Sequence, residues 1–358
     1  MSDTAVDLTK PPKEEPVFAV NTSRGFTSWL QEHKASLAVT TYQVGKLLFF
    51  GVKPDGKLWV FNRNIGRCLG LAIAGKDLWV TADTQIFKLV DALEPGQKNT
   101  GENDAFYVPQ MSYFTGDLDA HDLAVTGDGG LVFVNTLFNC LATVSPSHSF
   151  APLWRPSFIS RLAAEDRCHL NGVAMRDGKP AYVTATAMSD TFDGWRDQRQ
   201  SGGIVIDVAS NEIIARNLSM PHSPRWHRGR LWLHNSGTGE FGSIDLQSGR
   251  FEPLCFCPGY LRGLSFIGNH AVVGMSKPRD NKTFTGLVLD REMSRRRIEP
   301  RCGLYIVDLA SGDIVHSLTI EGVVSELYDC AVIPGKLQPA ALGPASPEVK
   351  RMISMAPH

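Results

Sequence analysis

The stretch His121-Asp-Leu-Ala-Val125, followed by Leu131-Val-Phe-Val-Asn-Thr136, contains the pattern that decides the fold. It consists of a polar residue, a short apolar strand, a tight turn and a second apolar strand. Varied copies of it start at Leu69, Asn171, His222, Arg262 and Tyr328. A distance of roughly 40 to 65 residues between such strand pairs is typical of a β-propeller, in which each repeat is one four-stranded blade. The sequence therefore predicts an all-β protein, a closed six-bladed propeller whose chemistry lies where the central channel opens.

The ring is expected to close by joining the two ends of the chain. The N-terminal part of the chain predicts three strands of a blade whose first strand is missing, over residues 37–42, 46–50 and 58–61. Residues 328–332 supply a single strand near the C-terminus, and pairing it with the N-terminal strands leaves no long edge exposed. We therefore expect a flexible N-terminal tail over residues 1–25, the propeller over 26–335 and a C-terminal tail over 336–358.

Composition argues against several kinds of partner. The 358 residues carry a formal net charge of -1, which gives no general attraction to nucleic acid or to an anionic membrane. No stretch approaches the roughly 18 uninterrupted apolar residues of a membrane span.

The seven cysteines, an odd number, fit reduced thiols, so we expect a cytoplasmic protein. In Cys255-Phe-Cys257 the two thiols share one face of a strand, and packing is favoured over a redox or metal role.

Aligning the six copies predicts which side chains meet at the channel mouth. Polar residues occupy equivalent positions at the starts of five innermost strands: His121, Asn171, His222, Arg262 and Tyr328. Side chains at such positions converge on the axis from different directions. The loops that enter these strands collect polar residues on one face of the disc, where binding and catalysis usually occur.

Three histidines of consecutive blades form a candidate metal site. His121, His169 and His222 are the expected ligands of a divalent metal, Zn or Fe(II) rather than Ca, with open positions for water or substrate. Carboxylates in the same loops are expected to orient the imidazole rings; these are Asp117, Asp119, Asp122 and Asp166. Two alternatives stay open, a polar site without metal and a merely structural lining of the channel.

The remaining candidates are assigned to substrate binding and proton transfer. Arg262 has a planar guanidinium group that suits a carboxylate, sulfate or phosphate ligand. The alternative role for Arg262 is an ion pair with Glu326 or Asp329. Tyr328 is expected either to donate a proton or to cap the channel. The candidate catalytic residues are His121, His222, Tyr328 and Asp329. Asn171, Asn235 and Trp195 are expected to help Arg262 hold a small, anionic substrate. The long segments 188–201 and 277–301 are expected to form a lid beside that mouth.

Four longer phrases resemble a known family. They are Phe150-Ala-Pro-Leu-Trp-Arg-Pro156, His169-Leu-Asn-Gly-Val-Ala-Met175, Met220-Pro-His-Ser-Pro-Arg-Trp226 and Leu233-His-Asn-Ser-Gly-Thr-Gly-Glu240. Over residues 25–335 the chain is similar to a bacterial family of conserved proteins with a domain of unknown function, a resemblance that implies no activity. More distantly, it resembles the gluconolactonase, senescence-marker and strictosidine-synthase-like six-bladed enzymes. That resemblance implies a divalent cation at the channel mouth, although only Asn171 matches its carboxylate and Asn ligands.

These observations favour an enzyme that acts on a small molecule at a His-lined channel mouth. Hydrolase or lyase chemistry through a metal-polarised oxygen is the leading class, and oxygen-dependent chemistry at a His-bound iron is a second one. The alternative from another class is a propeller that only binds a ligand or a protein.

Overall fold

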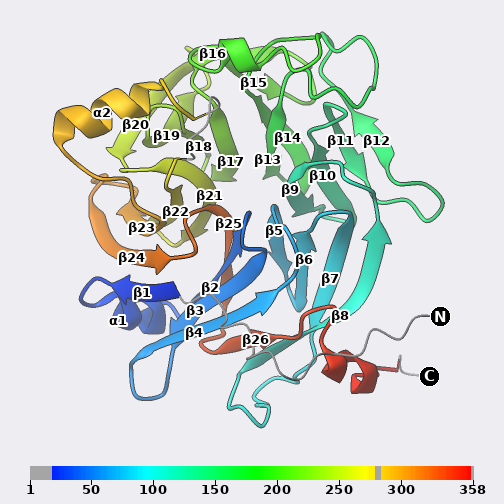
Figure 1. The fold of residues 1–358 in the computed structure, drawn as a ribbon, viewed down its shortest axis with the longest axis vertical. Coiled ribbons are helices and arrows are strands. Elements are labelled where there is room, and N and C mark those ends of the chain that lie inside the picture. Colours follow the sequence, from blue (N-terminus) through cyan, green and yellow to red (C-terminus); the bar gives the residue numbers. More distant parts are fainter. Residues whose placement is uncertain (1–17, 279–283, 356–358) are drawn as a thin grey trace, which may run out of the picture.

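The structure is a ring of six sheets, each built on four antiparallel strands, as the sequence predicts. The computed structural model describes residues 18–278 and 284–355, and strands make up almost all of its regular elements. Figure 1 shows the sheets arranged as blades around a central axis. The innermost strands β5, β9, β13, β17, β21 and β25 contact one another in this cyclic order, so the ring is closed. The expected all-β, six-bladed propeller is therefore confirmed.

Blade 1 joins the two ends of the chain. Its sheet has the order β25-β2-β3-β4, in which β25 comes from near the C-terminus and the other strands from near the N-terminus. Ala331 of β25 pairs with Ala38 of β2 in an antiparallel register. The bounds are β25 (Leu327–Pro334), β2 (Ala35–Thr41), β3 (Lys46–Val52) and β4 (Leu58–Asn64). The predicted closure is therefore confirmed.

The next three blades follow in chain order, each starting with its innermost strand. Blade 2 consists of β5 (Leu71–Ala74), β6 (Asp77–Thr81), β7 (Gln85–Asp91) and β8 (Ala105–Phe114). Blade 3 consists of β9 (Ala120–Val125), β10 (Leu131–Asn135), β11 (Cys140–Thr143) and β12 (Ala151–Trp154). Blade 4 consists of β13 (Leu170–Arg176), β14 (Lys179–Ala185), β15 (Gly203–Asp207) and β16 (Ile213–Leu218).

Blades 5 and 6 complete the ring. Blade 5 consists of β17 (Pro221–His227), β18 (Arg230–Asn235), β19 (Glu240–Asp245) and β20 (Arg250–Phe256). Blade 6 consists of β21 (Tyr260–Ile267), β22 (His270–Ser276), β23 (Gly303–Asp308) and β24 (Ile314–Gly322). Hydrophobic side chains fill the space between each pair of neighbouring blades, so the core is divided into six clusters around the axis.

Both ends of the propeller differ from the expected boundaries. β1 (Phe18–Thr22) lies within the expected N-terminal tail, yet it pairs with β24 as a fifth strand of blade 6. β26 (Pro339–Ala341) lies within the expected C-terminal tail, yet it pairs in parallel with β8 of blade 2. Each addition covers the outer edge of a blade, which a sheet otherwise leaves open to pairing with another chain. Residues 1–17 and 356–358 lie outside the described residues.

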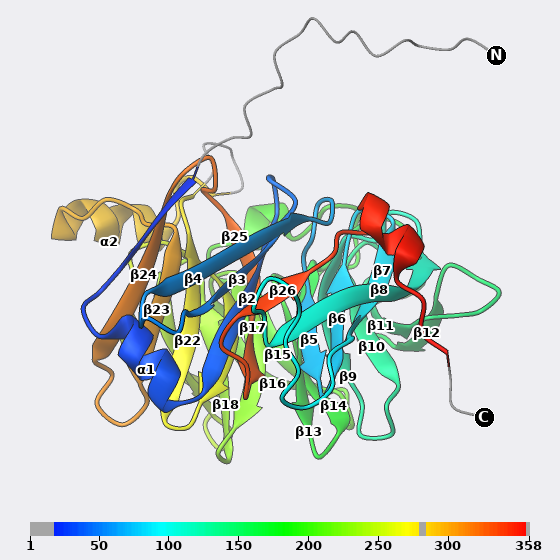
Figure 2. The ribbon, with the colours of Figure 1, turned by 90° about the horizontal axis from the view of Figure 1, so that it is seen from below.

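The few helices lie at the edges of the disc. They are α1 (Phe26–Glu32), α2 (Val288–Arg296) and two short 3-10 turns, η1 (Arg196–Gln198) and η2 (Pro347–Arg351). In Figure 2, α2 lies at the upper edge of the disc and the hairpin between β13 and β14 at its lower edge. Among the described residues, no helix is long and apolar enough to cross a membrane.

Neighbouring inner strands approach closely because glycine alternates with a small polar residue around the ring. Gly70, Gly172 and Gly263 of blades 2, 4 and 6 alternate with Asp122, Ser223 and Asp329 of blades 3, 5 and 1. A Cβ on Gly70 would lie 2.9 Å from the Cα of Asp122, and one on Gly263 would lie 2.8 Å from the backbone nitrogen of Cys330. A side chain at these glycines would therefore force the blades apart.

The small polar residues bind the next blade in return. Asp122 accepts a hydrogen bond from the backbone N–H of Val173 at 3.0 Å, and Asp329 accepts one from Leu71 at 3.0 Å. The hydroxyl of Ser223 accepts one from Gly263 at 2.9 Å. Each of these bonds runs from one inner strand to the next, so the centre of the ring is held by polar contacts as well as by packing.

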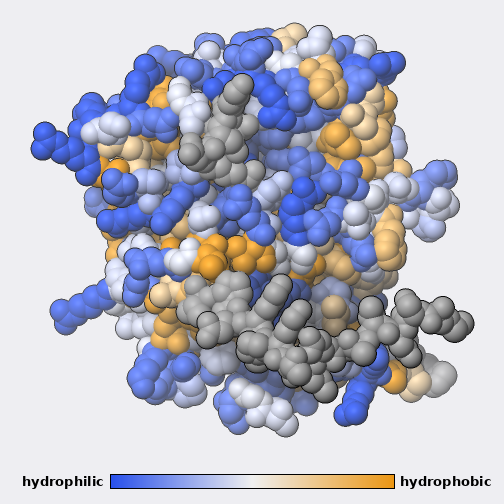
Figure 3. All heavy atoms as spheres, in the orientation of Figure 1, coloured by the Kyte–Doolittle hydropathy of each residue, from blue (hydrophilic) through white to orange (hydrophobic). Residues whose placement is uncertain are grey.

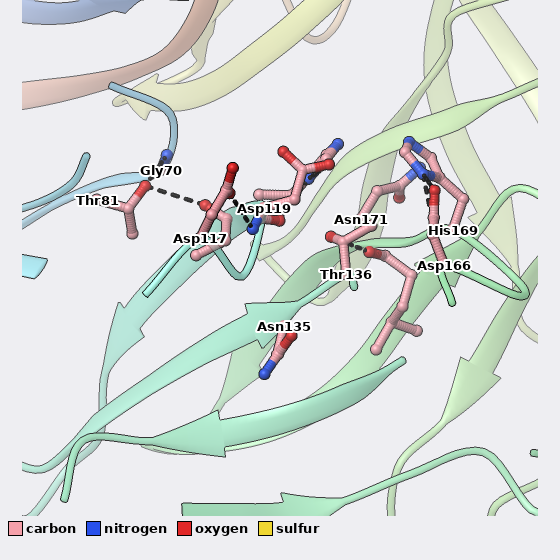
Figure 4. Close-up of polar contacts among 12 residues, drawn as sticks. Gly70, Thr81, Asp117, Asp119, Asn135, Thr136, Asp166, His169 and Asn171 are labelled. Carbon is pink, nitrogen blue, oxygen red and sulfur yellow. Dashed lines mark hydrogen bonds and ion pairs between the residues drawn. The ribbon is translucent and has the colours of Figure 1, made fainter. Parts of the chain in front are cut away.

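Hydroxyl groups at the ends of the second strands make a further ring of contacts. Thr136 donates to the carbonyl of Leu170 at 2.6 Å, and Thr81 donates to the carbonyl of Ala120 at 3.0 Å. Figure 4 shows Thr81 and Thr136 in these positions. The equivalent residues Thr40, Ser236 and Ser276 donate to Leu69, Leu261 and Leu327. In these five blades, the Thr or Ser at or just after the end of the second strand therefore links its blade to the next one.

Arg225 of blade 5 links three blades at the axis. It donates two hydrogen bonds to Asp122 of blade 3, at 2.7 and 3.1 Å, and lies 3.4 Å from the carboxylate of Asp329 of blade 1. We call Asp122, Arg225 and Asp329 the central triad. Both carboxylates are 3% exposed, and burial raises the pKa of Asp329 to about 7, an effect that Arg225 partly offsets.

We predict that Arg225→Met destabilises the fold by about 3–5 kcal/mol, because it leaves two buried carboxylates without their cation. The free energy of unfolding, measured by urea denaturation at neutral pH, checks this. Arg216→Met, which removes an exposed arginine from β16, is the control and is expected to change stability by less than about 0.5 kcal/mol. Equal stability of the two variants would show that the central triad does not hold the blades together.

Candidate functional site

The innermost strands bulge at the residues that the sequence aligns. The pairing register of the first two strands shifts around His121 in blade 3, Asn171 in blade 4 and Arg262 in blade 6. It also shifts just after His222 in blade 5 and around Tyr328 in blade 1. A bulge interrupts the ladder and changes the direction of a side chain. The bulges therefore bring polar side chains of several blades toward one end of the channel.

A cavity of about 130 Å³ lies among these side chains. Seven predicted residues line it: His121, His169, Trp195, Arg262, Tyr328 and the two carboxylates Asp119 and Asp166. Its other lining residues are Tyr42, Arg196, Met220 and Phe284. Figure 3 shows that hydrophilic residues predominate around the centre of this face of the disc. We refer to this space as the mouth cavity.

His121 lies on the blade 3 side of the mouth cavity. Its Nδ1 contacts the carbonyl oxygen of Asp119 at 2.8 Å, which assigns the proton to Nδ1 and leaves Nε2 as an acceptor. The ring is 6% exposed and packs edge-on against His169, with 4.7 Å between the ring centroids. Burial lowers the pKa of His121 to about 4, helped by His169 and Arg262 and opposed by Asp119. His121 is therefore neutral at physiological pH.

His169 forms a pair with a carboxylate on the blade 4 side. Its Nδ1 lies 2.9 Å from the Oδ2 atom of Asp166, as Figure 4 shows. Trp195 donates its indole N–H to the same carboxylate at 2.8 Å and stacks on the imidazole of His169 at 4.1 Å. This arrangement fixes the ring of His169 and leaves its Nε2 for another partner.

Arg262 and Tyr328 lie on the opposite side of the ring, in blades 6 and 1. The guanidinium carbon of Arg262 lies 4.7 Å from the ring centre of Tyr328, and its Nη1 donates to Glu326 at 2.9 Å. The ion pair with Glu326 is the alternative that the sequence left open for Arg262. Within the described part of the chain, the Nε of Arg262 and the hydroxyl of Tyr328 are buried without a hydrogen-bond partner. Burial raises the pKa of Tyr328 well above its usual value.

Four lining residues have a backbone conformation that is unusual for residues with side chains. The φ angles are 49° at Asp119, 40° at Asp166, 51° at His169 and 46° at Met220. Left-handed conformations of this kind cost free energy and are concentrated at functional sites. The loops that enter blades 3, 4 and 5 therefore hold the mouth cavity in a strained arrangement.

Two predicted residues lie outside the lining of the mouth cavity, next to each other. The Nδ1 of His222 contacts the carbonyl of Met220 at 2.8 Å, and its Nε2 lies 3.5 Å from the amide nitrogen of Asn171. Asn171 accepts a hydrogen bond from Thr184 at 2.7 Å. Burial lowers the pKa of His222 well below its usual value. Both residues are nearly fully buried, and their described contacts are with other protein groups.

Asn235 and Asp329 also lie outside the lining of the mouth cavity. The amide oxygen of Asn235 accepts a hydrogen bond from the backbone N–H of Ser219 at 2.7 Å, which fixes the loop between blades 4 and 5. Asp329 belongs to the central triad, as does Asp122, and Asp117 forms an ion pair with Arg67 at 2.8 Å. The structure therefore gives these residues positions that suit structural contacts rather than contact with a bound molecule.

The predicted histidine ligands do not fit a three-histidine metal site in this arrangement. Among the described residues, no group of three or more His, Cys, Asp or Glu side chains is able to hold a metal ion. His121 and His169 line the mouth cavity, whereas the Nε2 of His222 is turned to Asn171. Metal binding by His121, His169 and His222 stays a prediction, and we assign no chemical step to a metal.

The two long segments cover part of the mouth cavity. Trp195 of the first segment and Phe284 of the second are 2% and 5% exposed and pack in one apolar cluster. The cluster also contains Ala187, Met220, Tyr260, Leu287, Leu289 and Met293, and we call it the cap cluster. Arg199 donates to the carbonyl of Thr285 at 3.1 Å, which joins the two segments. Residues 279–283 of the second segment lie outside the described residues.

Sequence reasoning missed several lining residues. Tyr42 follows β2 of the composite blade 1 and stacks on Tyr328 at 5.7 Å between ring centroids. Because Tyr42 lies outside the innermost strands, alignment of their starts does not find it. Arg196 follows Trp195 in a segment without repeats and lies over its ring at 4.5 Å. The repeat gave no signal for either residue.

Comparison with known proteins identifies a family and the fold. The family described as a domain of unknown function (DUF4915) matches residues 24–342. No curated protein matches the sequence. Among solved structures, the chain is similar to a chain of a nidogen/laminin complex, with 11% identity, a TM-score of 0.51 and coverage of 84% of this chain and 98% of that chain. It is also similar to virginiamycin B lyase from Staphylococcus aureus, with 10% identity, a TM-score of 0.39 and coverage of 85% and 99%. The first likeness shows the fold alone, and the second adds no argument.

We predict that His121 makes the fold sensitive to acid. Its pKa is about 4 in the folded protein and about 6.5 in the unfolded chain, so between these pH values only the unfolded chain takes up the proton. The free energy of unfolding therefore falls as the pH is lowered through this window, by about 3 kcal/mol for this residue. Urea denaturation of the wild type and His121→Gln across this pH range is expected to show a smaller fall in the variant. Parallel curves would contradict the assignment of His121 as a buried, neutral group.

Proposed function

The chain belongs to the DUF4915 family, and we propose from its own residues that the mouth cavity is the active site of an enzyme that acts on a small molecule by acid–base catalysis. The observation that carries this proposal is the presence of two buried donors without a described partner, on Arg262 and Tyr328, in residues that line one cavity. An unpaired buried donor costs about 1–3 kcal/mol. A bound ligand that accepts both hydrogen bonds removes that cost.

The polarity of the lining favours a small hydroxylated carboxylic acid. Arg262 and Tyr328 of blades 6 and 1 offer donors, and they suit the oxygen atoms of a carboxylate or carbonyl group. Asp119 and Asp166 precede blades 3 and 4, on the other side of the ring, and their carboxylates suit the hydroxyl groups of the same ligand. The cavity of about 130 Å³ limits the ligand to a small molecule.

His169 is the proton-transferring residue in this proposal. The carboxylate of Asp166 accepts a hydrogen bond from Nδ1 of His169, so Nε2 of His169 accepts a proton from a water molecule or from the ligand. The same carboxylate stabilises the imidazolium that forms. Arg262 and Tyr328 donate to the oxygen on which negative charge develops. His121, neutral through its low pKa, accepts a hydrogen bond from the ligand. This chemistry serves hydrolases and lyases alike.

The first test measures binding. We predict that at least one of glycolate, lactate and malate binds more tightly in isothermal titration calorimetry than its counterpart without the hydroxyl group, acetate, propionate or succinate. Tyr328→Phe is expected to weaken binding about 3- to 10-fold, the worth of one hydrogen bond. Tyr107→Phe, at a buried tyrosine of β8 outside the cavity, is the control and leaves binding unchanged. Failure of all six acids to bind, or equal affinity of both variants, would contradict the proposed ligand.

The second test separates an enzyme from a protein that only binds. We predict that the wild type converts the acid that it binds, or exchanges its carbon-bound hydrogen for deuterium in D2O, as measured by NMR. Asp166→Asn is expected to lower this rate by about 100-fold or more, because it removes the carboxylate that orients His169. Asp190→Asn, which breaks a nearby ion pair with Arg167, is the matched control. An acid that binds but undergoes no reaction would favour the binding module.

A further inference from the structure

Two thiol groups lie close together at the end of the outermost strand of blade 5. Cys255 is the penultimate residue of β20, and Cys257 follows the strand directly. Their Sγ atoms are 4.0 Å apart. A disulfide needs about 2.05 Å between sulfur atoms, so closure requires an approach of roughly 2 Å. The strand is the outermost of its sheet, so among the described residues it has a neighbouring strand on one side only, where Cys255 pairs with Phe241 of β19.

Cys255 is the most accessible cysteine of the chain. It is half-buried, whereas Cys257 and the other five cysteines, Cys68, Cys140, Cys168, Cys302 and Cys330, are buried. Burial raises the pKa of Cys68, Cys140 and Cys302 to about 12, and it also raises the pKa of Cys168 and Cys330. Because the thiolate is the reactive form, these five thiols are poor nucleophiles.

The two thiols of the pair differ in a way that suits a sequential reaction. The hydrogen bond from Cys257 lowers the pKa of Cys255, whereas the same contact and burial raise the pKa of Cys257. Cys255 is therefore the first to ionise, and it is also the more exposed of the two. The reactive thiolate thus lies on the accessible side, with the second thiol behind it.

We propose that Cys255 and Cys257 form a reversible disulfide by exchange with a small disulfide such as oxidised glutathione. The thiolate of Cys255 attacks one sulfur of glutathione disulfide, forming a mixed disulfide and releasing one glutathione thiolate. Cys257, which is fully buried, then attacks the Cys255 sulfur, and its proton passes to the second glutathione as that thiolate leaves. The protein loses two electrons and two protons in total, and one glutathione disulfide becomes two glutathione thiols.

This disulfide acts on the lid of the mouth cavity, a consequence that rests on the proposed function. Phe256 lies between the two cysteines and packs against the cap cluster. The guanidinium of Arg296, in the last turn of α2, lies 4.2 Å from the ring centre of Phe256. Figure 1 shows α2 beside β20. Drawing the two flanking residues together moves Phe256 and weakens its contact with α2.

The test treats the full chain with oxidised glutathione and analyses it by mass spectrometry of peptides. In the wild type we expect an internal disulfide at Cys255 and Cys257 with no glutathione attached, and dithiothreitol restores both thiols. Cys257→Ser is expected to retain one glutathione on Cys255, and Cys255→Ser is expected to take up none. Two free thiols after treatment, or glutathione that stays on Cys255 of the wild type, would overturn the proposal.

Hydrogen exchange tests the effect on the lid separately from any enzymatic activity. Amides of α2 in the oxidised wild type are expected to exchange about two- to fivefold faster than in the reduced protein, which is the factor for losing one cation–π contact. Cys255→Ser, treated in the same way, is the control and shows no change. Oxidation without faster exchange in α2 would overturn the link to the lid. Neither measurement uses a substrate, so their outcome is distinguishable from failure of the proposed function.

Discussion

The close approach of the six inner strands is the constraint on which the rest of the structure depends. Glycines in blades 2, 4 and 6 let atoms of the next blade come within van der Waals distance, and Asp122, Ser223 and Asp329 bind across the remaining gaps. The two aspartates introduce buried negative charge at the axis, and Arg225 compensates it. The centre of the ring is therefore a polar assembly that is stable only when all of its members are present.

The site at the mouth is a consequence of this packing. The bulges that bring His121, Arg262 and Tyr328 to the channel occur beside the same positions that hold the blades together. The entering loops then adopt left-handed conformations at Asp119 and His169, and the surrounding rigid ring maintains that strain. The carboxylates of Asp119 and Asp166 lie on one side, together with Arg196 over the ring of Trp195, and the donors of Arg262 and Tyr328 lie on the other. This arrangement suits the small ligand that we propose.

Repetition allowed much of this arrangement to be predicted. His121, Arg262 and Tyr328 were found because they occupy one position of a repeated strand, and a ring brings equivalent positions together. The same alignment places His222 at the mouth, but its imidazole turns to Asn171 and does not line the cavity, because side chains at matched positions turn differently at each bulge. Residues contributed by unrepeated segments, such as Arg196, leave no periodic signal.

The sequence by itself determined the number of blades, the closure of the ring in blade 1 and the end of the channel at which polar groups gather. These features follow from short-range patterns, alternating apolar strands and turn residues, that recur along the chain. Tertiary structure alone decided which polar groups pair with each other. Arg262 contacts Glu326 and Arg225 contacts Asp122 because burial leaves each charge few partners within reach. That choice depends on distances between blades, which no local pattern encodes.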